Sequence, residues 1–183
     1  LRRLDDAIAR LREGLRARGL LERTDLIVVS DHGMADVPRE QRVWLEDVLD
    51  PALYDTEWWG TMLGLRPNPG QRDTVERAFL GAHPHFDCWT RETMPAVWRF
   101  GTNARIPPIV CQVRTGWRVQ SRGHHVYDQP VKGEHGFAMD DPTMRAVFVA
   151  AGPAFCRGAR LPAFDNVDLY PLLARLLHVK PAP

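Results

Sequence analysis

A run of four aliphatic residues, Leu26–Val29, ends directly at the tetrapeptide Ser-Asp-His-Gly of residues 30–33. The run is short, β-branched and without polar alternation, which predicts a strand buried on both faces. Before it, leucine or isoleucine recurs every three or four positions over residues 1–15, which predicts an amphipathic helix that ends at Gly19. A helix, a tight connection and a buried strand favour an α/β fold, in which ligands bind where strands end.

The rest of the chain predicts a mixture of short strands and helices. Strands are predicted over residues 58–65, 86–90, 109–113 and 144–151. Helices are predicted over residues 43–49, over 74–80 with Asp73 as N-cap, and over 166–177 with Asn166 as N-cap. Residues 38–98 are expected to form a small α+β insertion beside the main sheet, and the polar residues 121–136 are expected to form a long loop.

Charge and composition exclude several classes of protein. Lys and Arg number 24 against 23 Asp and Glu, so the chain lacks the basic excess of a protein that coats nucleic acid. No apolar run approaches the length of about 20 residues that a membrane-spanning helix needs. The cysteines at 88, 111 and 156 are too few and too widely spaced for a disulfide framework or a CxxC zinc site. They are compatible with one disulfide plus a free thiol, so the redox compartment stays open.

Asp31 and His32 stand where the predicted strand ends, so the backbone can turn both side chains toward one point. A carboxylate and an imidazole are ligands that zinc accepts, and Gly33 lets the backbone pass close to such a site. A surface turn explains the pair equally well from these residues alone. His135 lies between two glycines and by itself favours a solvated loop histidine, although a strand predicted shortly afterwards allows its loop to reach the same sheet edge.

The other histidines carry weaker signals. His83 and His85 flank a proline, which favours an exposed turn over a metal site.

Several longer motifs follow one another in a fixed order. They are Leu-Ile-Val-Val-Ser-Asp-His-Gly-Met at 26–34, Asn-Ala-Arg-Ile-Pro-Pro-Ile at 103–109 with Gly-Trp at 116–117, Gly-Glu-His-Gly-Phe at 133–137, Met-Arg-Ala-Val-Phe at 144–148, Gly-Pro-Ala-Phe at 152–155 and Phe-Asp-Asn-Val-Asp-Leu-Tyr-Pro-Leu-Leu at 164–173. Together they resemble the C-terminal half of the catalytic domain in the type I phosphodiesterase/nucleotide pyrophosphatase family, a branch of the alkaline phosphatase superfamily.

The resemblance implies an alkaline-phosphatase-like α/β fold with a central mixed sheet flanked by helices. It also implies a hydrolase that cleaves phosphodiester or pyrophosphate bonds of nucleotides or related small molecules with two Zn²⁺ ions. Asp31 and His32 match ligands of the zinc that activates the nucleophile, and His135 matches a ligand of the other zinc. In such enzymes a Thr or Ser hydroxyl attacks and forms a covalent intermediate.

The same resemblance places the nucleophile and the remaining ligands upstream of Leu1. Residues 1–183 are therefore expected to be the C-terminal part of a single catalytic domain, without the domain's N-terminal half and inactive alone. Phe137 stands where the family usually has Tyr, and Ala138 interrupts the family's His-Gly-Tyr-Asp-Asn run. Asp140 or Asp141 is predicted to replace the lost polar group as a hydrogen-bonding partner of a metal ligand.

Two alternatives to this function remain at this stage. One is another superfamily activity, namely phosphomonoesterase, phosphonate hydrolase or sulfatase, because the metal site is shared. The other is a non-catalytic domain that binds a partner or carbohydrate through its tryptophans, at 44, 58, 59, 89, 98 and 117. The family resemblance also implies a periplasmic or secreted enzyme that takes a small phosphodiester or nucleotide as substrate.

Overall fold

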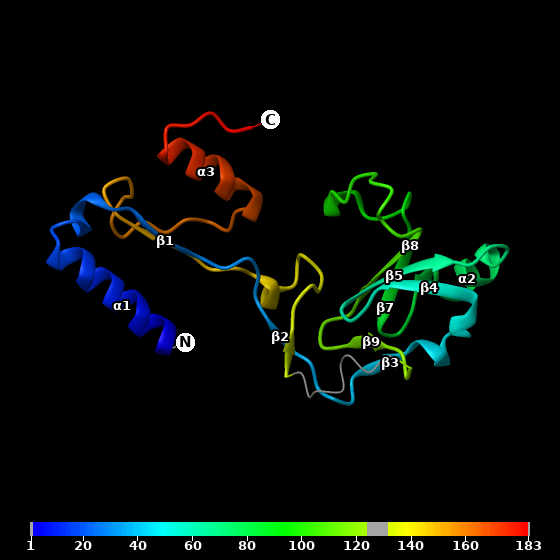
Figure 1. Ribbon diagram of the computed structural model, residues 1–183. Coiled ribbons are helices and arrows are strands. Elements are labelled where there is room, and N and C mark those ends of the chain that lie inside the picture. The colour runs from blue at the N-terminus through cyan, green and yellow to red at the C-terminus, as the bar shows by residue number, and fades with distance from the viewer. Residues whose placement is uncertain (1, 124–131, 183) are drawn as a thin grey trace. The chain divides into compact units, whose positions relative to one another are not determined.

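The computed structural model describes residues 2–123 and 132–182, and the chain divides into two compact units (Figure 1). Unit 1 combines Leu1–Asp31 with Ala146–Pro183, and unit 2 is His32–Arg145. The chain therefore leaves unit 1 after one strand and re-enters it just before another. Within the expected loop at 121–136, residues 124–131 lie outside the described residues, so the loop stays a prediction there.

Unit 1 consists of two helices and a two-stranded antiparallel ribbon. Its elements are α1 (Arg2–Ala17), β1 (Leu26–Val29), β11 (Phe148–Ala151) and α3 (Leu169–Leu176). Helix α1 confirms the predicted first helix, and Gly19 ends it in a left-handed conformation with φ +66°. In the part of the chain that the structure describes, no helix combines the length and the apolar character needed to cross a membrane.

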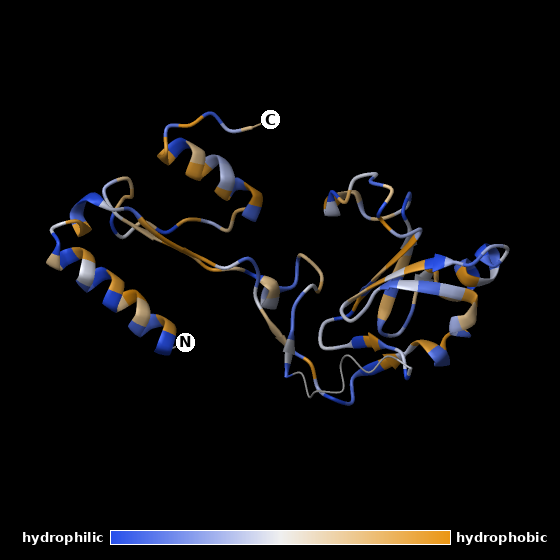
Figure 2. Cartoon of the chain, in the orientation of Figure 1, coloured by the Kyte–Doolittle hydropathy of each residue, from blue (hydrophilic) through white to orange (hydrophobic). Residues whose placement is uncertain are grey.

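The bounds of β1 agree with the prediction, but its predicted burial on both faces is wrong. Val29 is 42% exposed, and Val149 on the neighbouring strand is 57% exposed. Strand β1 pairs with β11 in a two-stranded sheet, from Leu26 opposite Ala151 to Val29 opposite Phe148. A ribbon of two strands leaves much of both faces open, and Figure 2 shows the apolar residues that run along it.

Two other predicted bounds in unit 1 also need correction. Strand β11 begins at Phe148 rather than at 144, because Pro142–Met144 forms a 3-10 turn. Helix α3 begins at Leu169 after a 3-10 turn at Asn166–Asp168, so Asn166 is not its N-cap. The Asn166 side-chain amide instead donates a hydrogen bond to the Asp31 carbonyl at 3.0 Å.

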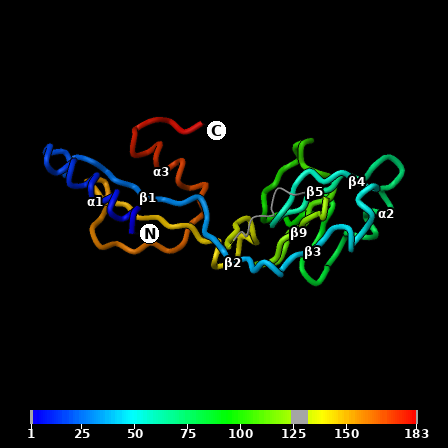
Figure 3. Tube along the Cα trace, turned by 60° about the horizontal axis from the view of Figure 1, so that its bottom comes forward, coloured from blue at the N-terminus to red at the C-terminus, as the bar shows by residue number. Residues whose placement is uncertain are grey.

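Unit 2 is built around a five-stranded antiparallel sheet in the order β4-β5-β8-β7-β6. Outside this sheet, β3 pairs in parallel with β9 (Figure 3), and β2 pairs antiparallel with β10. The elements of unit 2 are β2 (Ala35–Asp36), β3 (Arg42–Trp44), β4 (Tyr54–Trp58), β5 (Met62–Pro67), α2 (Arg72–Phe79), β6 (Gly81–Ala82), β7 (Phe86–Thr90), β8 (Ile109–Val113), β9 (Arg118–Gln120) and β10 (Gly133–Glu134). The mixture of helices and strands in the two units confirms the α/β class.

Helix α2 closes the main core of unit 2. Val75 and Phe79 are one helical turn apart, so they share a face, and both are fully buried in one cluster with Leu63 and Leu65 of β5. The helix was expected at 74–80 and begins two residues earlier. Asp73 therefore lies in its first turn instead of capping it, where a negative charge remains favourable.

Two predicted elements of unit 2 are replaced by different structures. Residues 58–65 were expected to form one strand, but β4 and β5 form a hairpin with Gly60 between them at φ +100°. Glycine adopts this conformation without steric cost, so the chain can reverse there. Residues 43–49 were expected to be helical, but β3 pairs along β9 and a 3-10 turn follows at Leu45–Asp47, with Leu45 fully buried. Burial of Leu45 in the sheet core overrides local helix propensity.

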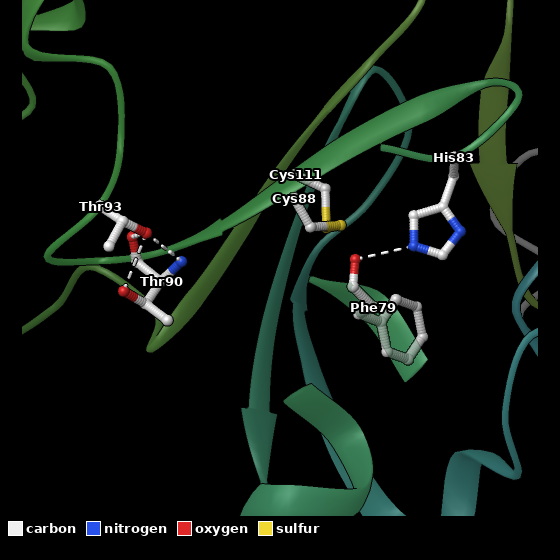
Figure 4. The surroundings of a disulfide bond; sticks show 6 residues. All are labelled: Phe79, His83, Cys88, Thr90, Thr93 and Cys111. Atoms are coloured by element: carbon white, nitrogen blue, oxygen red, sulfur yellow. Dashed lines mark hydrogen bonds between the residues drawn. A yellow bond between two sulfur atoms is a disulfide. The ribbon is translucent and has the colours of Figure 1, made fainter. Parts of the chain in front are cut away.

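A disulfide joins Cys88 of β7 to Cys111 of β8, which lie directly opposite each other in the sheet (Figure 4). Both sulfurs belong to the buried core, whereas Cys156 is free and exposed. Of the arrangements that the sequence left open, the structure therefore has one disulfide and one free thiol.

His83 and His85 lie in the expected turn, between β6 and β7, but their side chains are half-buried rather than exposed. The His83 ring stacks on Phe86, and its Nε2 lies 2.9 Å from the Phe79 carbonyl (Figure 4). The His85 ring stacks on Trp117 at 3.4 Å between ring centroids. Phe86, three residues along the chain, covers the His83 ring, and Trp117, from a distant part of the chain, covers the His85 ring.

Candidate metal centre

The end of β1 carries the first candidate ligand. The ribbon pairing continues one residue past Val29, since the Ser30 amide donates to the Val147 carbonyl at 3.1 Å. Asp31 follows as an exposed residue and is the last residue of unit 1. The hydrogen bond from Asn166 holds its backbone in place. Asp31 and His32 are neighbours in sequence, so the carboxylate that zinc ligation would use directly precedes the first residue of unit 2.

The His32 imidazole has a defined tautomer. Its Nδ1 lies 2.7 Å from the Gly33 carbonyl oxygen, which can only accept a hydrogen bond. Nδ1 therefore carries the proton, and in the neutral ring Nε2 keeps its lone pair. A histidine that donates one ring N–H to a carbonyl and offers the other nitrogen is the usual arrangement of a metal ligand.

His135 lies against His32 although about a hundred residues separate them in the sequence. Their ring centroids are 3.7 Å apart and the ring planes differ by 17°. The β2–β10 pair causes this meeting, because Ala35 is opposite Glu134 and the chain directions are antiparallel. The residues before β2 and those after β10 consequently emerge at the same end. Two imidazoles in contact supply donors of the kind that zinc accepts.

Gly33 is required by a close approach between backbones. A Cβ atom on Gly33 would lie 1.9 Å from the Thr143 carbonyl oxygen. The two segments are joined there by hydrogen bonds from the Gly33 amide to Met144 O and from the Met34 amide to Thr143 O. Residues 143–145 are therefore the segment that requires a glycine at position 33, and the predicted approach of this backbone to a metal site stays a prediction.

We expect Gly33→Ala to lower the free energy of unfolding of the protein by about 1–3 kcal/mol, because the methyl group must push the two segments apart. Urea unfolding measures this loss. The matched control is Gly14→Ala in α1, where a Cβ meets no atom closer than 3.5 Å and alanine favours the helix. Equal unfolding midpoints for Gly33→Ala and the unchanged protein would contradict the steric argument.

Asp141 holds the turn that contacts Gly33. One of its carboxylate oxygens accepts hydrogen bonds from the Thr143 amide at 2.7 Å and the Thr143 hydroxyl at 2.6 Å. The other accepts from the Thr115 hydroxyl. The bond from Thr115 and then those from Thr143 hold the pKa of Asp141 below its ordinary value. Asp140 is exposed beside it. A hydrogen bond from a metal ligand to the carboxylate of either residue stays a prediction.

Residues 134–137 are anchored by side chains that the sequence did not single out. Phe137 is buried with Ala35 and Val37 in a small second core, where a tyrosine hydroxyl is not needed. The anchors on the other three residues are Thr61, Gln112 and Arg118. Two of the three bind backbone carbonyls, which accept from any donor and leave no sequence motif. The third, Arg118, is buried, which is a tertiary property that the sequence does not show.

The described residues contain no group of three or more His, Cys, Asp or Glu side chains placed to hold a metal ion. Within unit 2, the donor set is the pair His32 and His135. Nitrogen donors of this kind fit zinc, and a complete coordination shell needs further ligands besides these two.

Comparison with known proteins gives consistent matches. The family model for type I phosphodiesterase/nucleotide pyrophosphatase matches residues 1–138, a segment that includes Asp31, His32 and His135. Human ectonucleotide pyrophosphatase/phosphodiesterase family member 5 is 31% identical over 98% of this chain and 37% of its own length. Human bis(5'-adenosyl)-triphosphatase is 28% identical over 100% of this chain and 39% of its own length.

Solved structures agree with these sequence matches. Murine ectonucleotide pyrophosphatase/phosphodiesterase 5 superimposes with a TM-score of 0.90 at 30% identity, over 98% of this chain and 48% of that one. An inactive variant of the murine protein in complex with AMP gives the same TM-score at 31% identity, over 98% of this chain and 47% of that one. The chain thus spans less than half of the length of each of these relatives.

Proposed function

Since this chain belongs to the type I phosphodiesterase/nucleotide pyrophosphatase family, we propose that the complete protein hydrolyses phosphodiester or pyrophosphate bonds of nucleotides or related small molecules. The observation that carries this proposal is the contact between His32 and His135 inside the matched segment. The AMP complex of the murine relative supports a nucleotide as the substrate class.

The residues of this chain would share two zinc ions. Asp31 and His32 would hold the one beside the attacking oxygen, and His135 would hold the other. Bound zinc would stabilise charge on the attacking and leaving oxygens of the displacement. The hydrogen bond from His32 Nδ1 to the Gly33 carbonyl would orient the ring so that Nε2 can ligate the zinc ion. No residue of this chain is assigned as the nucleophile, and a Thr or Ser hydroxyl elsewhere in the protein would form the covalent intermediate.

An oxidising compartment is part of the proposal. The buried disulfide between Cys88 and Cys111 is of the kind that persists outside the cytoplasm. The relatives are ectoenzymes by name. We therefore place the protein in the periplasm or outside the cell.

Hydrolysis of a nitrophenyl phosphodiester and of the matching monoester by the complete protein tests the proposed function. We expect strong preference for the diester and loss of turnover on treatment with a chelator, restored by Zn²⁺. Preference for the monoester would replace the diesterase assignment with a phosphatase one while keeping the metal residues. Turnover that survives chelation would refute the metal centre. Absence of turnover on both would refute the diesterase assignment in favour of a sulfatase, a phosphonate hydrolase or a binding domain.

A further inference from the structure

We propose that Thr61, Gln112 and Arg118 are positioning residues for His135. Each of them contacts one of the three consecutive residues Glu134, His135 and Gly136. The inference rests on the proposed function in one respect, which is that His135 binds zinc.

Thr61 fixes the backbone of His135 itself. Its hydroxyl donates a hydrogen bond of 2.7 Å to the His135 carbonyl oxygen, and only 9% of the residue is exposed. Thr61 lies just before β5, and its own carbonyl accepts from the Val113 amide of β8 at 3.0 Å. The donor is therefore held by the five-stranded sheet rather than by the loop that it anchors.

Gln112 of β8 fixes the next residue. Its side-chain nitrogen lies 3.1 Å from the Gly136 carbonyl and 3.3 Å from that of Thr61. These oxygens can only accept, so the amide must present its NH₂ group to them. Gly136 has φ +88°, and a Cβ there would lie 2.8 Å from the Thr61 hydroxyl oxygen. Gly136 therefore packs directly against the Thr61 side chain, which also holds the His135 carbonyl.

Arg118 of β9 fixes the residue before His135. Its side chain is 2% exposed, and Nη2 lies 3.0 Å from the carboxylate of Glu134, whose side chain is 21% exposed. A buried guanidinium needs a carboxylate nearby, so this pair ties β10 to the interior of unit 2. Glu134 is also opposite Ala35 in the β2–β10 pair, and His32 lies three residues before Ala35 in the sequence.

Taken together, these contacts fix three successive residues around a histidine that is itself exposed. An exposed side chain contributes little to folding, so the anchors do not serve its burial. They set the position of the His135 backbone relative to His32. The separation of these two residues decides whether both imidazoles can bind neighbouring metal ions.

Thr61→Val in the complete protein tests the inference, because it keeps the side-chain shape and removes the hydroxyl. We expect zinc affinity, measured by competition with a chelator, and kcat for a phosphodiester each to fall about 10- to 100-fold. Thr61→Ser restores the hydroxyl and should recover both. The matched control is Thr93→Val, which removes a hydroxyl that bonds to Thr90 at the far end of β7, and it should change neither (Figure 4).

The failure of this inference can be distinguished from the failure of the proposed function. If His135→Ala lowers zinc content but Thr61→Val leaves zinc affinity and kcat unchanged, the positioning role is wrong. If His135→Ala leaves zinc content unchanged, the metal assignment itself is wrong. Urea unfolding of the metal-free variants separates positioning from general destabilisation, since a positioning role predicts weak zinc binding at an unfolding midpoint close to that of the parent.

Gln112→Met supplies an independent variant should Thr61→Val not fold. Gln112 is half-buried, and methionine fills the same length without donating a hydrogen bond. We expect a loss of zinc affinity of about 10-fold in this variant. An unchanged affinity would overturn the role of Gln112.

Discussion

Replacing His135 with alanine is expected to remove one zinc ion from the complete protein and to lower kcat/KM for a phosphodiester by at least about 100-fold. The side chain is exposed and stacks on His32, so its loss leaves no buried cavity. Its removal therefore costs little folding energy, and the functional effect is separable from stability. Metal analysis of the purified variant and the initial rate of diester hydrolysis measure the two effects.

His178→Asn is the matched control for this prediction. His178 is exposed, lies in unit 1 and has φ +55°, a conformation that asparagine also tolerates. Zinc content and rate should both stay at the level of the parent. Full activity in His135→Ala would refute the role assigned to His135, whatever the control gives.

Removing the disulfide is the second change for which we expect a large effect. The double variant Cys88→Ala/Cys111→Ala should lower the free energy of unfolding by about 3 kcal/mol, because the bond closes a loop with a sequence separation of 23 and so restricts the unfolded chain. Both residues are buried in the core that α2 closes, so the lost sulfur contacts add to this loss. Urea unfolding followed by tryptophan fluorescence reports the change, since Trp89 directly follows Cys88.

Cys156→Ser provides the control for the disulfide. This thiol is free and exposed, so its replacement should leave the unfolding midpoint where it was. If the double cysteine variant unfolds at the same urea concentration as Cys156→Ser, the disulfide contributes nothing to stability.

Strands that form the middle of a sheet were predictable from sequence, whereas reversals and exposed ribbons were not. The bounds of β7 and β8 agree with prediction, and each of these two strands pairs with a neighbour on both sides in the five-stranded sheet. The hairpin at Gly60 was missed because tryptophan and methionine on both sides of it look like one strand. The exposure of β1 was missed because the number of strands beside it is a tertiary property.

The candidate site shows a similar division. Asp31, His32 and His135 could be singled out because ionisable residues next to glycines follow or precede strands. The proximity of His32 to His135 depends on the β2–β10 pair, and each strand of that pair is only two residues long. Such short strands carry no periodic signal. Thr61 and Gln112 could not be predicted from the sequence, because their hydrogen-bond acceptors are main-chain oxygens, which are the same at every position.

From the close approach of the two backbone segments at Gly33 we also expect an order of events in folding. The hydrogen bonds from Gly33 and Met34 to residues 144 and 143 hold the two ends of unit 2 side by side. Once unit 2 has folded, the segments that become β1 and β11 start from neighbouring points, so the entropy of closing the long loop between them has already been overcome. The ribbon can then zip from Val29 and Phe148 outward to Leu26 and Ala151. Unit 2 would thus act as a folding template for a strand pair that is remote in sequence.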